Sequence, residues 1–114
     1  MANKTITFTY DGKDYVLEFT RRTVQELEAD GFRPNLVEEM PATYVPMLFA
    51  GAFKAHHRFT KQEVINDIYS NFPNKTDLLA TLGEMYSAPI LALMDEPDKG
   101  KEEDGKNIEW RVVE

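Results

Sequence analysis

The chain has 114 residues, of which 42% are hydrophobic and 11% aromatic, and it carries a formal net charge of −7. This length fits one domain with a single core, and this composition argues against a wholly disordered chain. The negative charge repels phosphate backbones and therefore argues against nucleic-acid binding.

Residues 5–19 predict a β-hairpin. In residues 5–10 apolar side chains alternate with threonine, and in residues 15–19 Tyr15, Leu17 and Phe19 alternate with Val16 and Glu18. This is the period of half-buried strands. Asp11-Gly12 separates the halves and supplies a turn in which glycine takes a positive φ. Because two strands alone are marginally stable in water, we expect the aromatic face of the hairpin to lie on helices or on another strand.

Threonines after the hairpin predict the start of the first helix. Thr20 or Thr23 can cap it, and Thr23 with Glu26 fits the capping box, in which a hydroxyl and a carboxylate satisfy free backbone N–H groups. Gly31 then offers a left-handed stop, and Phe32 offers the apolar contact that often accompanies it.

The most apolar segment follows. A short helical piece from Asn35 to Met40 is expected to end at Pro41, and Thr43 is expected to cap the next helix with Pro46 in its first turn. Apolar rows at helical spacing predict a central helix that is buried on most sides. These rows contain Val45, Phe49 and Phe53, then Leu48, Ala52 and Ala55, beside Tyr44 and Met47.

Two further helices complete the body. Thr60 with Glu63 fits a second capping box, and Asn74 with Asp77 is expected to open the last helix. Pro89 is expected to kink that helix or to divide it in two. The apolar stripe of the last helix comprises Leu78, Leu79, Leu82, Met85, Tyr86, Ile90, Leu91, Leu93 and Met94.

The sequence therefore predicts an α+β, mostly helical fold, with an N-terminal hairpin packed on about four helices in a domain over residues 1–94. Residues 95–114 form an acidic, flexible tail with eight acids and four bases, hence a charge of −4. The tail ends in an apolar stub that contains Trp110, the single tryptophan of the chain. A large aromatic beyond a solvated linker suggests docking on the body of the chain or on a partner.

No catalytic set is recognisable. His56 and His57 are adjacent, so on a helix they point about 100° apart and cannot share one metal ion; we expect solvated histidines near a helix C-terminus. The acidic residues at 26–30 and 38–39 fit the outer faces of amphipathic helices. The chain has no cysteine, and its glycines are scattered. We expect no enzyme activity, no cofactor and no metal.

The best indication of function in the body is its excess of apolar helix surface over what a hairpin and four short helices hide. Met and aromatic side chains repack against varied partners, although the same helical spacing is typical of a core. We predict a protein–protein surface on the last helix, on the helix at 44–57 and on the apolar stub. The candidate partner-binding residues are Tyr44, Met47, Phe49, Phe53, Met85, Tyr86, Ile90, Met94, Ile108, Trp110 and Val112.

Most of the chain resembles one family. The hairpin ITFTYDGKDYVLEF running into TRRTVQELEADGF, and then MLFAGAFKAHH, TKQEVINDIY and LLATLGEMYSAPILALMDEP, resemble the tail assembly chaperones of tailed bacteriophages, or prophages, of Gram-positive hosts. The resemblance lies in patterns of fold, and it is firmest over residues 5–33 and 44–95.

This resemblance implies a non-enzymatic protein encoded upstream of the tape-measure gene. Such a protein binds the tape-measure protein during tail-tube assembly, self-associates, and is absent from the mature virion; the tail-tube protein is a further candidate partner. Relatives are often made in a second, longer form by ribosomal slippage, in which case the tail marks the point where the longer product diverges.

A second interpretation comes from the charge. A small acidic regulator or inhibitor would occupy a basic partner, and its carboxylates would cluster on one face. The N-terminus lacks a signal pattern, and no window approaches the roughly 18 apolar residues that span a bilayer. We therefore expect no membrane partner and a location in the cytoplasm of the bacterial host.

Overall fold

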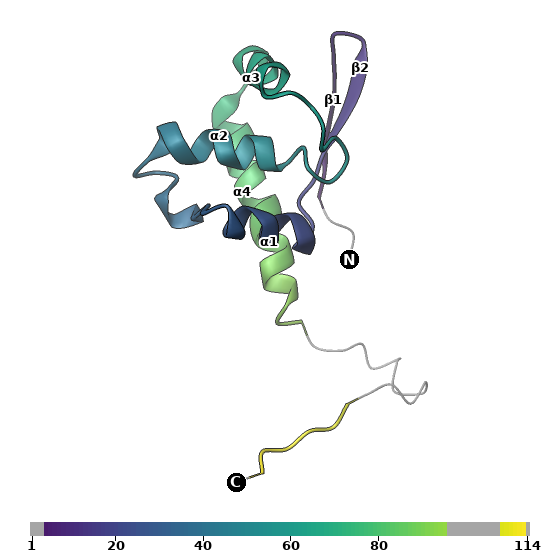
Figure 1. Cartoon of the computed structure of the whole chain (residues 1–114), viewed down its shortest axis with the longest axis vertical. Helices are drawn as coiled ribbons and strands as arrows, with labels where there is room; N and C mark the ends of the chain where they lie inside the picture. The colour runs from purple at the N-terminus through teal and green to yellow at the C-terminus, as the bar shows by residue number, and fades with distance from the viewer. Residues whose placement is uncertain (1–3, 96–107, 114) are drawn as a thin grey trace.

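The computed structural model of the chain describes residues 4–95 and 108–113. Within them a two-stranded antiparallel hairpin precedes four α-helices, which confirms the expected α+β class (Figure 1). In chain order the elements are β1 (Ile6–Tyr10), β2 (Lys13–Leu17), α1 (Arg21–Ala29), the 3-10 helix η1 (Pro34–Leu36), α2 (Pro41–Gly51), α3 (Gln62–Asn71) and α4 (Lys75–Ala92).

The hairpin has the predicted strands and turn. Tyr10 pairs with Lys13, so only Asp11 and Gly12 connect the strands, and their φ angles are 51° and 78°. Two positive φ values define a type I′ turn, whose twist matches that of the strands. On the inner face the ring of Phe8 packs edge-to-face on Phe72 at 5.3 Å, which confirms that the aromatic face lies on the helices.

The first helix is capped by Thr20 rather than by the Thr23–Glu26 pair. The amide of Thr23 donates to the hydroxyl of Thr20 at 3.2 Å, and the amide of Thr20 donates to the hydroxyl of Thr23 at 2.9 Å. Because this box leaves Thr23 buried in the first turn, Glu26 is free to turn outward to basic side chains.

The end of α1 is set by a glycine, as predicted. Gly31 has a φ of 97°, and the amide of Phe32 reaches back to the carbonyl of Leu27 at 2.9 Å, which is the pattern of a Schellman motif. A second glycine lets α2 approach this point closely. A Cβ on Gly51 would lie 2.6 Å from a methyl carbon of Leu27.

The boundaries predicted for α2 are wrong. Pro41 begins the helix instead of ending the preceding piece, Thr43 lies in the first turn, and Pro46 lies inside the helix. A proline at the first helical position loses no hydrogen bond, because that N–H has no intrahelical partner. The helix is also less buried than expected, since its fully buried side chains are confined to its C-terminal half and the turn that follows.

The starts of α3 and α4 also differ from the prediction. Lys61 occupies the cap position of α3, and the hydroxyl of Thr60 instead donates to the carbonyl of His57 at 2.9 Å. Asn74 does precede α4, but it adopts a left-handed φ of 53° and makes no side-chain cap, because it serves the tight turn between the helices. Pro89 does not divide α4, which runs unbroken to Ala92.

The core lies where α1, α2 and α4 meet below the hairpin, and Figure 1 shows α4 crossing behind α2 and α1. Tyr86 of α4 is at its centre. The Tyr86 ring packs edge-to-face on Phe19 at 5.5 Å and on Phe32 at 5.0 Å. These aromatic contacts join the strand exit, the end of α1 and the middle of α4 into one cluster.

Candidate functional site

Both histidines contact the segment of β2, one through its backbone and the other through the side chain that follows the strand. The backbone N–H of Val16 donates to Nε2 of His57 at 3.0 Å, and Nε2 of His56 lies 2.6 Å from a carboxylate oxygen of Glu18. The expectation of two solvated histidines therefore holds for His56, which is exposed, and is wrong for His57, which is partly buried. Helix α2 ends at Gly51, so both histidines sit in the turns that run beside β2, and sequence neighbours gave no sign of these distant partners.

The environment of His57 favours the neutral ring. Partial burial lowers the pKa of His57 from its usual value of 6.5, and the positive charges of Lys13 and His56 lower it further. A neutral ring is also what the hydrogen bond needs, since Nε2 accepts the Val16 N–H and so carries no proton. His57 thus supports the fold and shows no arrangement for catalysis.

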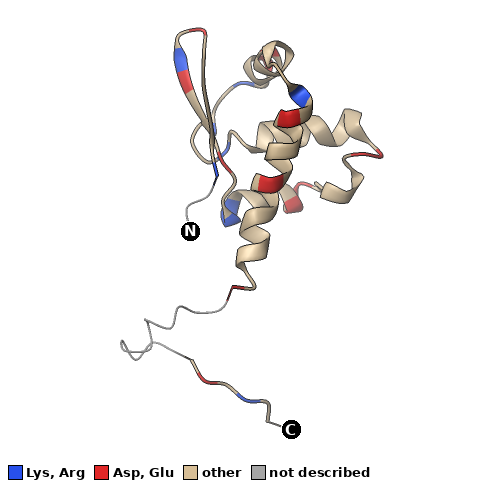
Figure 2. Cartoon of the chain, turned by 180° about the vertical axis from the view of Figure 1, so that it is seen from behind, with Lys and Arg blue, Asp and Glu red and all other residues tan. Residues whose placement is uncertain are grey.

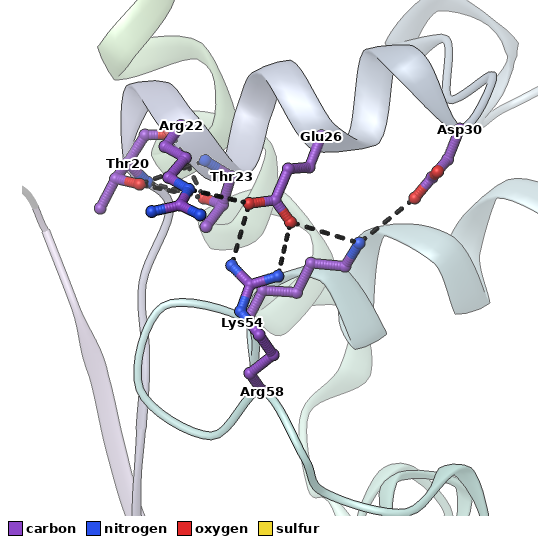
Figure 3. Close-up of polar contacts among 7 residues, drawn as sticks. All are labelled: Thr20, Arg22, Thr23, Glu26, Asp30, Lys54 and Arg58. Atoms are coloured by element: carbon purple, nitrogen blue, oxygen red, sulfur yellow. Dashed lines mark hydrogen bonds and ion pairs between the residues drawn. The ribbon is translucent and has the colours of Figure 1, made fainter.

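A charged cluster joins α1 to the turns after α2 (Figure 3). The guanidinium of Arg58 makes two hydrogen bonds to the carboxylate of Glu26, at 2.7 and 2.9 Å. Lys54 lies between that carboxylate and Asp30, at 3.8 and 3.2 Å, and Arg22 approaches Glu26 at 3.4 Å. The hydrogen bond from Arg58 is the main cause of the lowered pKa of Glu26, so this carboxyl group stays ionised. Glu26 and Asp30 are thus both paired with cations.

Four of the residues predicted to bind a partner lie in the core instead. Phe49, Phe53, Met85 and Tyr86 are each at most 2% exposed. They are unavailable to a partner in this conformation, which corrects the prediction. Tyr44 and Met47 are half-buried and pack against the core. The reason is geometric: α2 and α4 cross, so their apolar rows cover each other where the helices meet.

The other residues of that prediction are exposed. Ile90 of α4 is 37% exposed, and Met94, in the turn that follows α4, is 83% exposed. In the C-terminal segment Ile108, Trp110 and Val112 are all exposed, and Trp110 is 81% exposed. Docking of Trp110 on the body of its own chain is thus not what the structure shows.

The exposed end of α4 is the candidate functional site. We define the α4 tip as Ile90, Leu91, Leu93 and Met94, all of which are exposed large hydrophobic residues. Figure 1 shows this end of α4 continuing past α1, where no other helix covers it. Figure 2 shows no charged residue on α4 between Glu84 and the acidic residue that follows the helix. The tip is therefore an uncharged apolar projection.

Two members of the α4 tip were missing from the predicted binding set. Leu91, which is 69% exposed, and Leu93 belong to the apolar stripe but were not assigned to a partner. A signal for them exists in the sequence. Consecutive apolar residues at 90–94 cover every face of a helix, whereas a helix packed on one side shows a single stripe.

One hollow of the structure is mostly apolar. An apolar groove of about 250 Å³ lies between α2 and α3, lined by Val45, Phe49, Ile65 and Tyr69 among others. Its only titratable group is the phenol of Tyr69. Among the described residues, no three His, Asp or Glu side chains are grouped to hold a metal ion.

The helices of residues 4–95 include none that is long and apolar enough to cross a membrane. Two carboxylates of the same residues are paired with cations. Glu26 is paired with Arg58 and Glu84 with Lys4, the latter at 2.8 Å.

Comparison with known proteins identifies a family without a described activity. A family described as a domain of unknown function (DUF5055) matches residues 1–113. No curated protein and no solved structure matches the chain significantly.

Proposed function

We propose that this chain, which belongs to the DUF5055 family, is a phage tail assembly chaperone that binds and solubilises the tape-measure protein during tail-tube assembly. The observation that carries the proposal is the α4 tip, an apolar helix end that projects uncovered from the body. A tape-measure protein is long and helical, and the apolar face of an amphipathic helix is the surface that such a projection can cover.

The limited size of the α4 tip fits a chaperone that must later release the tape-measure protein. Full burial of a large aliphatic side chain is worth roughly 1.5–3 kcal/mol, and these four side chains are already partly shielded. Their combined contribution is on the order of 5 kcal/mol before the cost of association, which alone corresponds to weak binding. Many copies along one tape measure would bind collectively and still be displaced by polymerising tube subunits.

The alternative, an acidic inhibitor of a basic partner, has less support. It requires a face of unpaired carboxylates, whereas Glu26 and Glu84 are held by Arg58 and Lys4. Both carboxyl groups have lowered pKa values, chiefly through hydrogen bonds to those cations. The described part of the body therefore offers a mixed charge pattern (Figure 2).

The proposal is tested by co-expressing the chain with overlapping fragments of the tape-measure protein from the same genome. We expect the wild type to keep at least one fragment soluble and to co-purify with it. The double substitution Leu91→Asp and Met94→Asp should abolish this, because it places charge on the apolar surface. Ala80→Asp with Ser87→Asp adds the same charge at exposed positions nearer the middle of α4 and should leave binding intact.

Two results would contradict the proposal. One is a wild-type protein that neither solubilises nor retains any tape-measure fragment. The other is equal loss of binding in both double variants, which would assign the effect to net charge and not to the α4 tip. A tape-measure gene immediately downstream is the expected genomic context.

A further inference from the structure

The two edges of the hairpin differ in how their backbone groups are satisfied. On the outer edge of β2, the N–H of Val16 donates to His57, and the N–H of Glu18 donates to the carbonyl of Ala52 at 3.0 Å. The turns after α2 thus cover this edge. A covered edge cannot accept another strand.

The outer edge of β1 is open. Tyr10 and Lys13 close the two-residue turn, so Ile6, Phe8 and Tyr10 point their backbone groups toward β2. The alternate residues, Thr7 and Thr9 with Thr5 before them, point theirs away. No backbone hydrogen bond to these three threonines is formed by any residue in the ranges 4–95 and 108–113. Such an edge is a template for a further strand.

The C-terminal segment has the composition of that strand. Along residues 108–113, Ile108, Trp110 and Val112 alternate with Glu109 and Arg111, and β-branched and aromatic residues dominate. All six are exposed, and none is helical or paired as a strand. An exposed segment of this kind leaves its large apolar side chains in water, and pairing with a strand edge would remove these side chains from water.

We propose that residues 108–113 of one copy add to the open edge of β1 in a second copy, as the third strand of its sheet. The two faces match in one register. Ile108, Trp110 and Val112 would continue the inner face of Ile6 and Phe8. There they would adjoin an apolar hollow lined by Ile6, Phe72 and Leu78. Glu109 and Arg111 would then lie with the exposed threonines, and a slip of one residue would reverse both faces.

The choice of a second copy rests on the exposure of the segment in the single chain, although the connecting residues would let it reach its own edge. Lys4 contacts Glu84, so β1 begins beside the middle of α4, and the eight helical steps from Glu84 to Ala92 span about 12 Å. The 12 connecting residues 96–107 extend to at most about 40 Å, so the segment can reach its own edge. Even so, the segment is exposed in the single chain. Pairing between copies would supply hydrogen-bond partners to the open edge and would cover the apolar side chains of the exposed segment.

This inference stands on the hairpin and the C-terminal segment alone. It requires neither the α4 tip nor a tape-measure protein. Its test therefore uses the purified full chain without any partner, and its failure is distinguishable from failure of the proposed function.

Neighbouring residues provide a matched pair of substitutions. Val112→Glu places a charge on the face that would be covered, whereas Val113→Glu places the same charge on the opposite face; both side chains are exposed in the single chain. Light scattering after size exclusion should show wild type and Val113→Glu associating with rising concentration. Val112→Glu should associate at least tenfold more weakly.

Trp110 reports the same event directly, because it is the only tryptophan. In dilute solution its emission should be that of an exposed indole. As copies associate, the emission should shift to shorter wavelength and become protected from acrylamide. The Val112→Glu variant should keep the exposed spectrum over the same range of concentration.

A mixing experiment separates pairing between copies from pairing within one chain. Thr7→Pro removes the outward N–H of β1, and proline is tolerated at such a position because it breaks no bond to β2. This variant has a blocked edge and an intact segment, whereas Val112→Glu with Trp110→Phe has a blocked segment and an intact edge. Each should remain monomeric alone, and the mixture should form a 1:1 complex in which Trp110 of the first is protected. If Thr7→Pro does not fold, as judged by circular dichroism, Thr9→Pro replaces it.

Three outcomes would overturn the proposal. The first is equal association of the Val112→Glu and Val113→Glu variants. The second is a monomer whose Trp110 is protected at every concentration, which would assign the segment to its own edge. The third is a mixture of the two blocked variants that forms no complex.

Discussion

The stretch from Leu78 to Met94 has two halves that are both rich in apolar residues and have opposite environments. From Leu78 to Tyr86 it carries core residues, whereas from Ile90, near the end of α4, to Met94 its large side chains are exposed. The hairpin repeats this contrast, with a β2 edge covered by His57 and Ala52 and a β1 edge that is open. In both elements, one side maintains the fold and the other is available to a partner. The exposure differs because other elements pack against one part and not against the other.

The largest expected effect comes from truncating one leucine in each half of α4. Leu82 is fully buried, so Leu82→Ala should lower the free energy of unfolding by about 2–5 kcal/mol through lost contacts and a cavity. Leu91→Ala should change it by less than about 0.5 kcal/mol, because the side chain is exposed and alanine favours helix. Urea unfolding followed by circular dichroism measures both. A similar loss in the two variants would remove the contrast between the halves.

A smaller effect is expected at the boundary between the halves. The hydroxyl of Tyr86 is buried without a hydrogen-bond partner in the described part of the chain, and burial chiefly raises its pKa. Removing an unsatisfied polar group relieves its desolvation cost, so Tyr86→Phe should leave stability unchanged or raise it by about 1 kcal/mol. Tyr69→Phe, at a half-buried ring on α3, is the control and should stay near zero. Clear destabilisation by Tyr86→Phe would mean that the hydroxyl has a partner.

The smallest expected effect concerns pH and the covered edge of β2. The pKa of His57 is lowered in the folded chain, so the unfolded chain binds the proton more readily. The stability that His57 contributes is therefore complete above its usual pKa of 6.5 and declines as the pH falls below it. Urea unfolding between about pH 7.5 and 5.5 should show this decline.

His57→Gln provides the control for this pH dependence. Glutamine keeps an acceptor for the Val16 N–H and does not titrate, so its slope over the same range should be flatter. All other titratable groups are present in both proteins, so the difference between the two slopes reports the substitution of His57. Identical slopes would exclude His57 as the source.

Much of the candidate site was predictable from the sequence, but which of the apolar residues would be exposed was not. The apolar residues at the end of the last helix were identified as a possible surface, together with residues that proved to be core. Met85 and Met94 are nine residues apart, and both fit the apolar stripe that the sequence predicts for the last helix. Only the crossing of α1 and α2 over the first half buries Met85 and leaves Met94 free.

The sequence by itself determined features that depend on neighbouring residues. The alternation of the strands and the Asp11-Gly12 turn specify the hairpin, since these residues alone suit the φ values of a type I′ turn. Gly31 specifies the end of α1 in the same local way. The α+β order follows from such signals, because they act within a few residues of chain.

Tertiary structure decided what depends on distant contacts. Thr20 and Thr23 both fit the cap of α1 in the sequence, and the fold uses Thr20 and buries Thr23. His57 accepts a hydrogen bond from the edge of β2 only because its turn lies beside that strand. The same holds for the open β1 edge and the α4 tip. A side chain or a strand edge becomes a surface only where packing leaves it uncovered, and packing joins residues that the sequence keeps far apart.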